Sequence, residues 1–168
     1  DGSIYSILVE GTDIAGNKSE PFIIDSVTYD LTKPTVDIMN PRNNDFIKNS
    51  NIIFNNFEDL QDLKIQYNNV SGDQDQNSPH SVSLSGSYLK KGYQEVVIPS
   101  LLPRLNDGSF YDISITAKDL AGNESDPFIL SNILYDITKP IIQNIFPING
   151  KYINSTDVLL KTNEDLIK

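Results

Sequence analysis

The sequence predicts an all-β protein, a sandwich of short strands that repeats along the chain about every 106 residues. Two observations lead to this prediction. Apolar residues alternate with polar ones or form short clusters, and Gly, Pro, Asn and Asp interrupt them about every 8 to 15 positions. In addition, residues 1–62 align without a gap to residues 107–168, and 24 of the 62 aligned positions are identical.

The composition supports a strand-rich globular chain. It has 168 residues, of which 38% are hydrophobic, and Ile, Val, Tyr, Phe and Thr favour strands over helices. The chain has no Cys, which excludes disulfide scaffolds, thiol catalysis and thiolate metal sites. Its net charge of -10 argues against nucleic acid or anionic lipid as a partner. The longest apolar runs are about three residues, so no membrane insertion is expected of this segment.

One complete repeat is expected to hold seven strands, which is typical of a β-sandwich. The predicted strands are residues 35–39, 51–54, 63–67, 81–84, 94–99, 110–117 and 128–135. A helical turn is the alternative for residues 57–63. The clearest strand is 110–117, where every second residue is apolar and predicts a core face. The expected core consists of Tyr111, Ile113, Ile115, Phe128, Val36, Ile38 and Ile53.

Two Lys-Pro pairs, Lys33-Pro34 and Lys139-Pro140, separate the repeats, because Pro ends the strand before it and begins a stiff linker. This phase predicts three parts. Residues 1–32 are the C-terminal part of one repeat, residues 33–138 are a complete repeat, and residues 139–168 are the N-terminal part of another.

Two motifs carry a resemblance to a known family. The segment Asp107-Gly108-Ser109-Phe110-Tyr111 resembles the tyrosine corner of immunoglobulin-like and fibronectin type III sandwiches, in which the Tyr hydroxyl bonds back across the corner. The motifs Asp-x-Ala-Gly-Asn (119–123) and Tyr-Asp-x-Thr-Lys-Pro (135–140) occur in both copies. Together they resemble the bacterial immunoglobulin-like repeats of large surface adhesins.

This resemblance implies an immunoglobulin-like sandwich that acts as a spacer or stalk in an extracellular or cell-surface adhesin. Neighbouring repeats of the same chain are then partners, and a host, matrix or cell-surface ligand is a candidate partner. The alternative is a carbohydrate- or protein-binding module, appended to a secreted enzyme, that binds through its loops. Its candidate residues are Tyr88, Tyr93 and the loop 71–79, although a chain without Trp lacks the usual aromatic platform for sugars.

Catalysis is not expected. The only His, His80, ends the polar loop 72–80 and is interpreted as solvated. A site with two His ligands is impossible in one chain, and the Gly residues are scattered rather than gathered in a phosphate-binding loop.

The carboxylates suggest a Ca²⁺ site where one repeat meets the next. The resemblance places the linker, the second loop and the last turn of a sandwich at one pole, and adhesin repeats of this kind bind Ca²⁺ near their junctions. The expected ligands there are Asp30, Glu58, Asp59, Asp119 and Asn123, and those of the next junction are Asp136, Glu164 and Asp165. Without metal, Asp119 would be a turn cap, Asp30 a solvated linker residue, and Glu58 and Asp59 parts of a polar loop.

Overall fold

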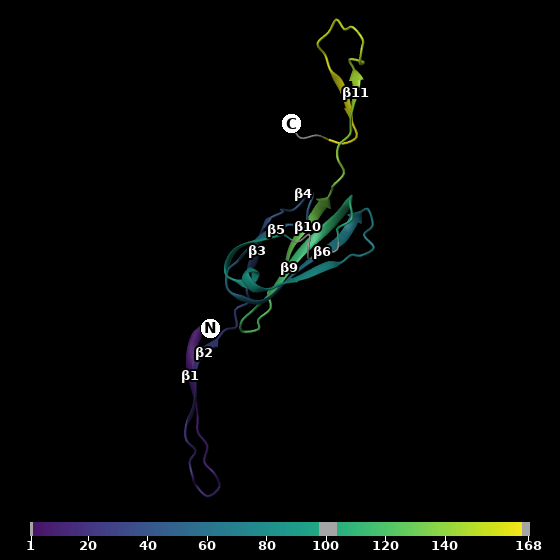
Figure 1. Cartoon of the computed structure of the whole chain (residues 1–168). Coiled ribbons are helices and arrows are strands. Elements are labelled where there is room, and N and C mark those ends of the chain that lie inside the picture. Colours follow the sequence, from purple (N-terminus) through teal and green to yellow (C-terminus); the bar gives the residue numbers. More distant parts are fainter. Residues whose placement is uncertain (1, 98–103, 166–168) are drawn as a thin grey trace. The chain divides into compact units, whose positions relative to one another are not determined.

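The structure is a computed structural model that describes residues 2–97 and 104–165 (Figure 1). It divides into two compact units, Asp1–Tyr135 and Asp136–Lys168. The first unit holds a hairpin followed by a β-sandwich, and the second holds a single hairpin. Among the described residues, no helix has the length and apolar character that a membrane crossing requires.

The elements follow one another along the chain as short strands with one 3₁₀ turn. The first hairpin is β1 (Ser3–Val9) and β2 (Phe22–Tyr29). The sandwich contains β3 (Val36–Asn40), β4 (Phe46–Ile47), β5 (Ile52–Asn56), β6 (Leu60–Gly72), β7 (His80–Leu84), η1 (Gly86–Leu89), β8 (Gly92–Val96), β9 (Ser109–Asp119) and β10 (Phe128–Tyr135). The second hairpin is β11 (Ile142–Phe146) and β12 (Leu159–Thr162).

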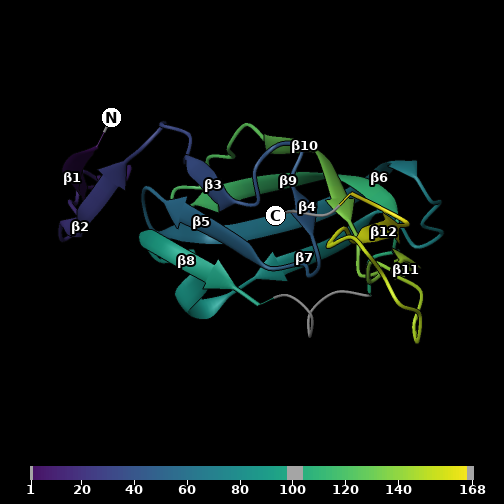
Figure 2. The same cartoon turned by 90° about the horizontal axis from the view of Figure 1, so that it is seen from above.

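The sandwich has a three-stranded sheet, β3-β5-β8, and a five-stranded sheet, β4-β10-β9-β6-β7. Figure 2 shows the two sheets as layers, with β5 and β8 in front of β9 and β6. All pairs within the sandwich are antiparallel except β4 with β10, which is parallel. This arrangement confirms the predicted immunoglobulin-like sandwich.

All seven predicted strands occur; β10 has the predicted bounds, 128–135, and the other six have shifted ends. The strand predicted at 63–67 is much longer, since β6 begins at Leu60, and the helical turn suggested for residues 57–63 is therefore wrong. The strand predicted at 94–99 begins two residues earlier, at Gly92, and its predicted last residues 98 and 99 lie outside the described part. The alternation of apolar residues did not reveal β4, because two residues are too few to show a period.

The core lies where the alternation in β9 predicts it. Tyr111, Ile113 and Ile115 are fully buried, and Val36 and Ile38 of β3 are buried opposite them. Ile53 and Phe128 are only half-buried, so these two core predictions are wrong. In the apolar run of β5 the buried residues are the neighbours of Ile53, namely Ile52 and Phe54. Three consecutive apolar residues cannot by themselves show which face points inward.

The tyrosine corner predicted from the sequence is present. The Tyr111 hydroxyl accepts a hydrogen bond from the backbone N–H of Asn106 at 2.9 Å. The hydroxyl also donates to the Asp75 carboxylate at 2.5 Å, and both side chains are buried. This hydrogen bond joins the loop between β6 and β7 to the start of β9. A second one joins the same segments, because the Ser109 hydroxyl donates to the Asp73 carbonyl at 2.6 Å.

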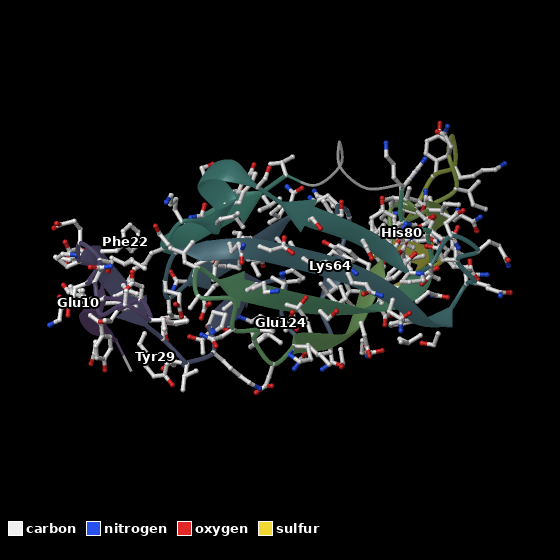
Figure 3. The ribbon with its side chains drawn as sticks, turned by 90° about the horizontal axis from the view of Figure 1, so that it is seen from below. Glu10, Phe22, Tyr29, Lys64, His80 and Glu124 are labelled. Carbon is white, nitrogen blue, oxygen red and sulfur yellow. The ribbon has the colours of Figure 1, made fainter. Side chains whose placement is uncertain are left out.

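His80 contradicts the interpretation of a solvated loop residue. It is 2% exposed, and its Nε2 lies 2.5 Å from the same Asp75 oxygen that binds Tyr111. Because a carboxylate can only accept, Nε2 carries the proton in this contact. His80 is the first residue of β7, and it alternates with the buried Val82 and Leu84, which is the signal that the sequence did offer. Figure 3 labels His80 at this end of the sandwich.

The loop that carries Asp75 approaches the β9 corner very closely. A Cβ atom on Gly72, whose φ is +75°, would lie 2.3 Å from the Gly108 carbonyl oxygen. Only glycine fits both the positive φ and this contact. The Asp73 N–H donates to that carbonyl at 3.1 Å, and the Gly108 N–H donates to the Tyr135 carbonyl at 2.9 Å. The β6–β7 loop, the corner and the end of β10 are thus joined.

We expect Tyr111→Phe to destabilise the sandwich by about 2 kcal/mol, because a hydrogen bond to a buried carboxylate is lost and Asp75 keeps its burial without that donor. Urea unfolding followed by far-UV circular dichroism measures the change. Tyr93→Phe, on an exposed Tyr of β8, is the matched control and should leave the midpoint unchanged. Equal midpoints for wild type and Tyr111→Phe would contradict the role given to the corner.

We also expect a specific loss of stability in acid. Burial raises the pKa of Asp75, but hydrogen bonds from Tyr111, His80 and the Asn77 N–H outweigh it and leave the pKa below its usual value. A lowered folded pKa stabilises the fold above the unfolded value of about 3.9, and this contribution is lost as the pH falls through the folded pKa. In urea unfolding, Asp75→Asn should be less stable than wild type at pH 6 and lose less stability between pH 5 and pH 2. Parallel pH profiles would contradict this assignment.

Candidate functional site

The candidate site lies in the first unit, where three segments meet. These are the linker at residues 30–35, the bend between β5 and β6 at residues 57–59, and the turn between β9 and β10 at residues 119–123. The carboxylates of Asp30, Glu58 and Asp119 each place one oxygen so that all three oxygens lie within 4.8 Å of one another. Asp119 is buried, and Asp30 and Glu58 are half-buried. We call these three residues the acidic cluster.

Asp119 is held in place by the turn that follows it. Its Oδ1 accepts hydrogen bonds from the backbone N–H groups of Ala121 and Asn123, both at 2.8 Å, and its Oδ2 accepts from the Asn123 side-chain amide at 2.8 Å. The carboxylate is therefore a turn cap, as one reading of the sequence predicts. Burial raises the pKa of Asp119, but these hydrogen bonds outweigh it and keep the pKa below the usual value.

The same turn recurs in the hairpin β1–β2. There Asp13 Oδ1 accepts from the Asn17 N–H at 2.8 Å, and the Asn17 amide donates to Oδ2 at 2.9 Å. The two Asp-x-Ala-Gly-Asn motifs thus have one local structure, which depends on the motif alone. Asp13 is exposed and is not grouped with other carboxylates among the described residues, so it shows the turn without the cluster.

Asn123 connects the turn to the linker. Its side-chain amide donates to the Asp30 carbonyl oxygen at 3.1 Å as well as to Asp119. The Asp30 carboxylate is oriented locally, because its Oδ1 accepts from the Thr32 N–H at 2.9 Å. A second tie joins the linker to the residues that follow the turn: the exposed ion pair of Lys33 with Asp126, at 2.6 Å. Neither of these two contacts is predicted from the sequence.

Glu58 is the member of the cluster whose negative charge is least favourable. Its pKa is raised, first by burial and then by the negative charges of Asp119 and Asp30, while Lys91 opposes the rise. A carboxyl with a raised pKa weakens the folded state at neutral pH, where it must ionise beside two like charges. The cluster is therefore a place where positive charge would be stabilising.

Asp59 makes other contacts than the predicted ones. Its carboxylate accepts from the Lys90 ammonium at 2.9 Å and from the Lys91 N–H at 2.8 Å, which lowers its pKa. Asp59 lines the same surface pocket as Asp30 and Glu58, but its carboxylate does not belong to the group of three oxygens. Lysine neutralises Asp59, whereas nothing of positive charge contacts Glu58 directly among the described ion pairs.

The residues predicted for the next junction lie in the second unit. The Asp136 Oδ1 accepts from the Thr138 N–H at 2.9 Å, which repeats the local structure of Asp30. Glu164 is half-buried, and its Oε1 has no hydrogen-bond partner in the described part of the chain, while Asp165 is exposed. Over residues 2–97 and 104–165, no second group of three carboxylates comes together.

The residues named for loop-based binding are only partly available. Tyr93 is 58% exposed, but Tyr88 is half-buried in η1, and its carbonyl accepts from the buried Asn56 amide at 2.8 Å. The loop 71–79 is tied to the core through Asp75.

The comparisons with known proteins agree with this architecture. The family model of the bacterial Ig-like domain (group 3) matches residues 1–129, which include β1–β2 and most of the sandwich. No curated protein matches the chain. The chain therefore belongs to the family of bacterial Ig-like domains (group 3).

Proposed function

We propose that the chain is a spacer segment of an extracellular or cell-surface adhesin, and that Ca²⁺ bound by the acidic cluster stiffens the linker between its repeats. Domains of this family are generally non-catalytic binding or spacer modules, which favours a mechanical role over a chemical one. The observation that carries the proposal is the meeting of Asp30, Glu58 and Asp119, from three segments distant in sequence.

The donor set fits a hard divalent cation. All three side chains offer carboxylate oxygens, which Ca²⁺ prefers, and none offers nitrogen or sulfur. A carboxylate has about four acceptor positions. The contacts of Asp119 and Asp30 with backbone and amide groups therefore leave acceptor capacity toward an ion. With one oxygen each, the three carboxylates supply three of the six to eight oxygens that Ca²⁺ takes, so carbonyl groups or water would complete the shell.

The bound ion would supply positive charge and a crosslink. The pKa of Glu58 is raised first by burial and then by repulsion from Asp119 and Asp30, and the positive charge of the ion would offset this repulsion. The crosslink joins linker, bend and turn, whereas Asn123 and Lys33 hold the linker to the region of the turn by weaker contacts and do not reach the bend. Binding to the folded state alone stabilises it by RT ln(1 + [Ca²⁺]/Kd), about 2.7 kcal/mol when free Ca²⁺ is 100 times Kd.

Calorimetry and thermal melting with Ca²⁺ or chelator test this function. We expect saturable binding and a rise in Tm with Ca²⁺ for the wild-type chain. Asp119→Ala should abolish both effects, whereas Asp13→Ala, which removes the same turn cap outside the cluster, should keep them. The absence of binding in the wild-type chain, or an equal loss in both variants, would reject the proposed role of the cluster.

Glu58→Gln separates repulsion from ligation. In chelator the variant should melt at a higher temperature than wild type, because the like charge beside Asp119 and Asp30 is gone. With Ca²⁺ it should gain less than wild type, because a ligand is lost. Glu164→Gln, at the equivalent position of the next repeat, is the matched control and should change neither value in the sandwich transition. A Glu58→Gln variant that is destabilised in chelator would contradict the repulsion.

In chelator, lowering the pH should act on the Tm in the same direction as Glu58→Gln, because protonation also removes the negative charge of Glu58. Because the folded pKa of Glu58 is raised, its contribution favours the folded state increasingly as the pH falls through that value toward the unfolded pKa of about 4.3. As the pH falls from 7 toward that unfolded pKa, the Tm of the wild-type chain should therefore rise relative to the Tm of Glu58→Gln, and saturating Ca²⁺ should remove this difference in pH dependence.

A further inference from the structure

The hairpin β1–β2 has one apolar face that the described residues of its unit leave half exposed. Tyr5, Ile7 and Val9 lie at alternate positions of β1, and Ile24 and Tyr29 lie on β2. These side chains are between 42% and 51% exposed. We call these five residues the hairpin face. Tyr29 is labelled where it projects from the hairpin in Figure 3.

The hairpin has the same strand register as β9–β10 in the sandwich. Tyr5 pairs with Val27 and Ile7 with Ile24, as Tyr111 pairs with Ile133 and Ile113 with Leu130. The register shift falls at the same place in both pairs.

The irregular residue of this shift is also the same. Ser26 has a φ of 61°, and Asn132, which stands 106 positions later, has a φ of 63°. An identical bulge fixes which side chains share a face, because a slip of one residue would reverse every side chain. The hairpin therefore presents the same face as β9–β10.

In the sandwich, the equivalent face is covered. Tyr111, Ile113, Ile115, Leu130 and Tyr135, which correspond to the five residues of the hairpin face, are at most 7% exposed. The edge of β9 pairs with β6, where Tyr67 lies opposite Ile113 and Ile65 opposite Ile115. The buried face packs against the other sheet, whose strands also belong to residues 33–106.

We propose that the hairpin face is an interaction surface for a strand set of the same kind as residues 33–106, so that β1–β2 closes a second sandwich. The partner must offer an edge strand to β1, as β6 does to β9, and an acceptor for the Tyr5 hydroxyl, as Asp75 does for Tyr111. This proposal goes beyond the proposed function and requires no cation.

A second copy of the chain is a poorer occupant. In each copy, β9–β10 already occupies the matching position on residues 33–106, so the hairpin of a neighbour would have to displace a pair of fully buried strands. A strand set without its own closing hairpin has no such competitor.

The test joins a duplicate of residues 33–106 directly before residue 1 of the full chain. Native-state hydrogen exchange is measured in chelator on this extended chain and on the original chain. We expect the β1 amides to exchange fast in the original chain and to be protected at least 100-fold more in the extended chain. The amides of β9 report in both chains whether the original sandwich is intact.

Two variants of the extended chain complete the test. Tyr5→Asp should return β1 to fast exchange while β9 stays protected, whereas Thr12→Asp, outside the hairpin face, should leave β1 protected. Unchanged fast exchange at β1 with a protected β9 would overturn the proposal, and so would protection that survives Tyr5→Asp. Protection of β1 in the original chain that rises with protein concentration would assign the surface to a second copy instead and would also overturn it.

Discussion

The hydrogen bond from the Tyr111 hydroxyl to the buried Asp75 carboxylate constrains one whole end of the sandwich. A buried charge is costly unless it is fully hydrogen-bonded, and Asp75 meets this requirement with Tyr111, His80 and the Asn77 N–H. The loop that carries it must therefore fold over the start of β9. The central strand of the five-stranded sheet, β9, and the loop that covers its end are consequently positioned by one side chain, and this explains why the only His of the chain is buried.

In the acidic cluster, by contrast, one of the carboxylates lacks, within the described part of the chain, the hydrogen bonds that would offset its burial. Asp119 is ionised and well bonded, whereas Glu58 lies beside it with a raised pKa. A structure that only required turn caps would not need Glu58 at this position, since the turn at Asp13 forms without such a neighbour. Local hydrogen bonding thus explains the structure of the motif Asp-x-Ala-Gly-Asn. The presence of Glu58 beside the turn is what distinguishes the junction at Asp119 from the isolated turn at Asp13.

The sequence predicted the fold well because its signals were local or repeated. The alternation in β9 identified Tyr111, Ile113 and Ile115 as core, and the offset of 106 residues revealed the paired turns. Prediction from the sequence failed where side-chain contacts between distant residues determine the structure. Nothing near Asp75 in the sequence indicates that its carboxylate binds the Tyr111 hydroxyl. Likewise, the Asp59 carboxylate binds the Lys90 ammonium instead of joining the other carboxylates. The grouping of Asp30, Glu58 and Asp119 was predicted through the resemblance, which supplied the three-dimensional proximity that spacing alone lacks.

The parallel pairing of β4 with β10 has a mechanical consequence. The two strands lie near opposite ends of the repeat in sequence, and their contacts include bonds from the Leu134 N–H to Asp45 and from the Asn44 N–H to Ser131. A pull on the two ends of the repeat draws parallel strands past each other, so it loads these bonds in shear rather than opening them one at a time. Extension of the repeat must then break these bonds together, so the short β4 adds to the tension that the sandwich bears before it yields.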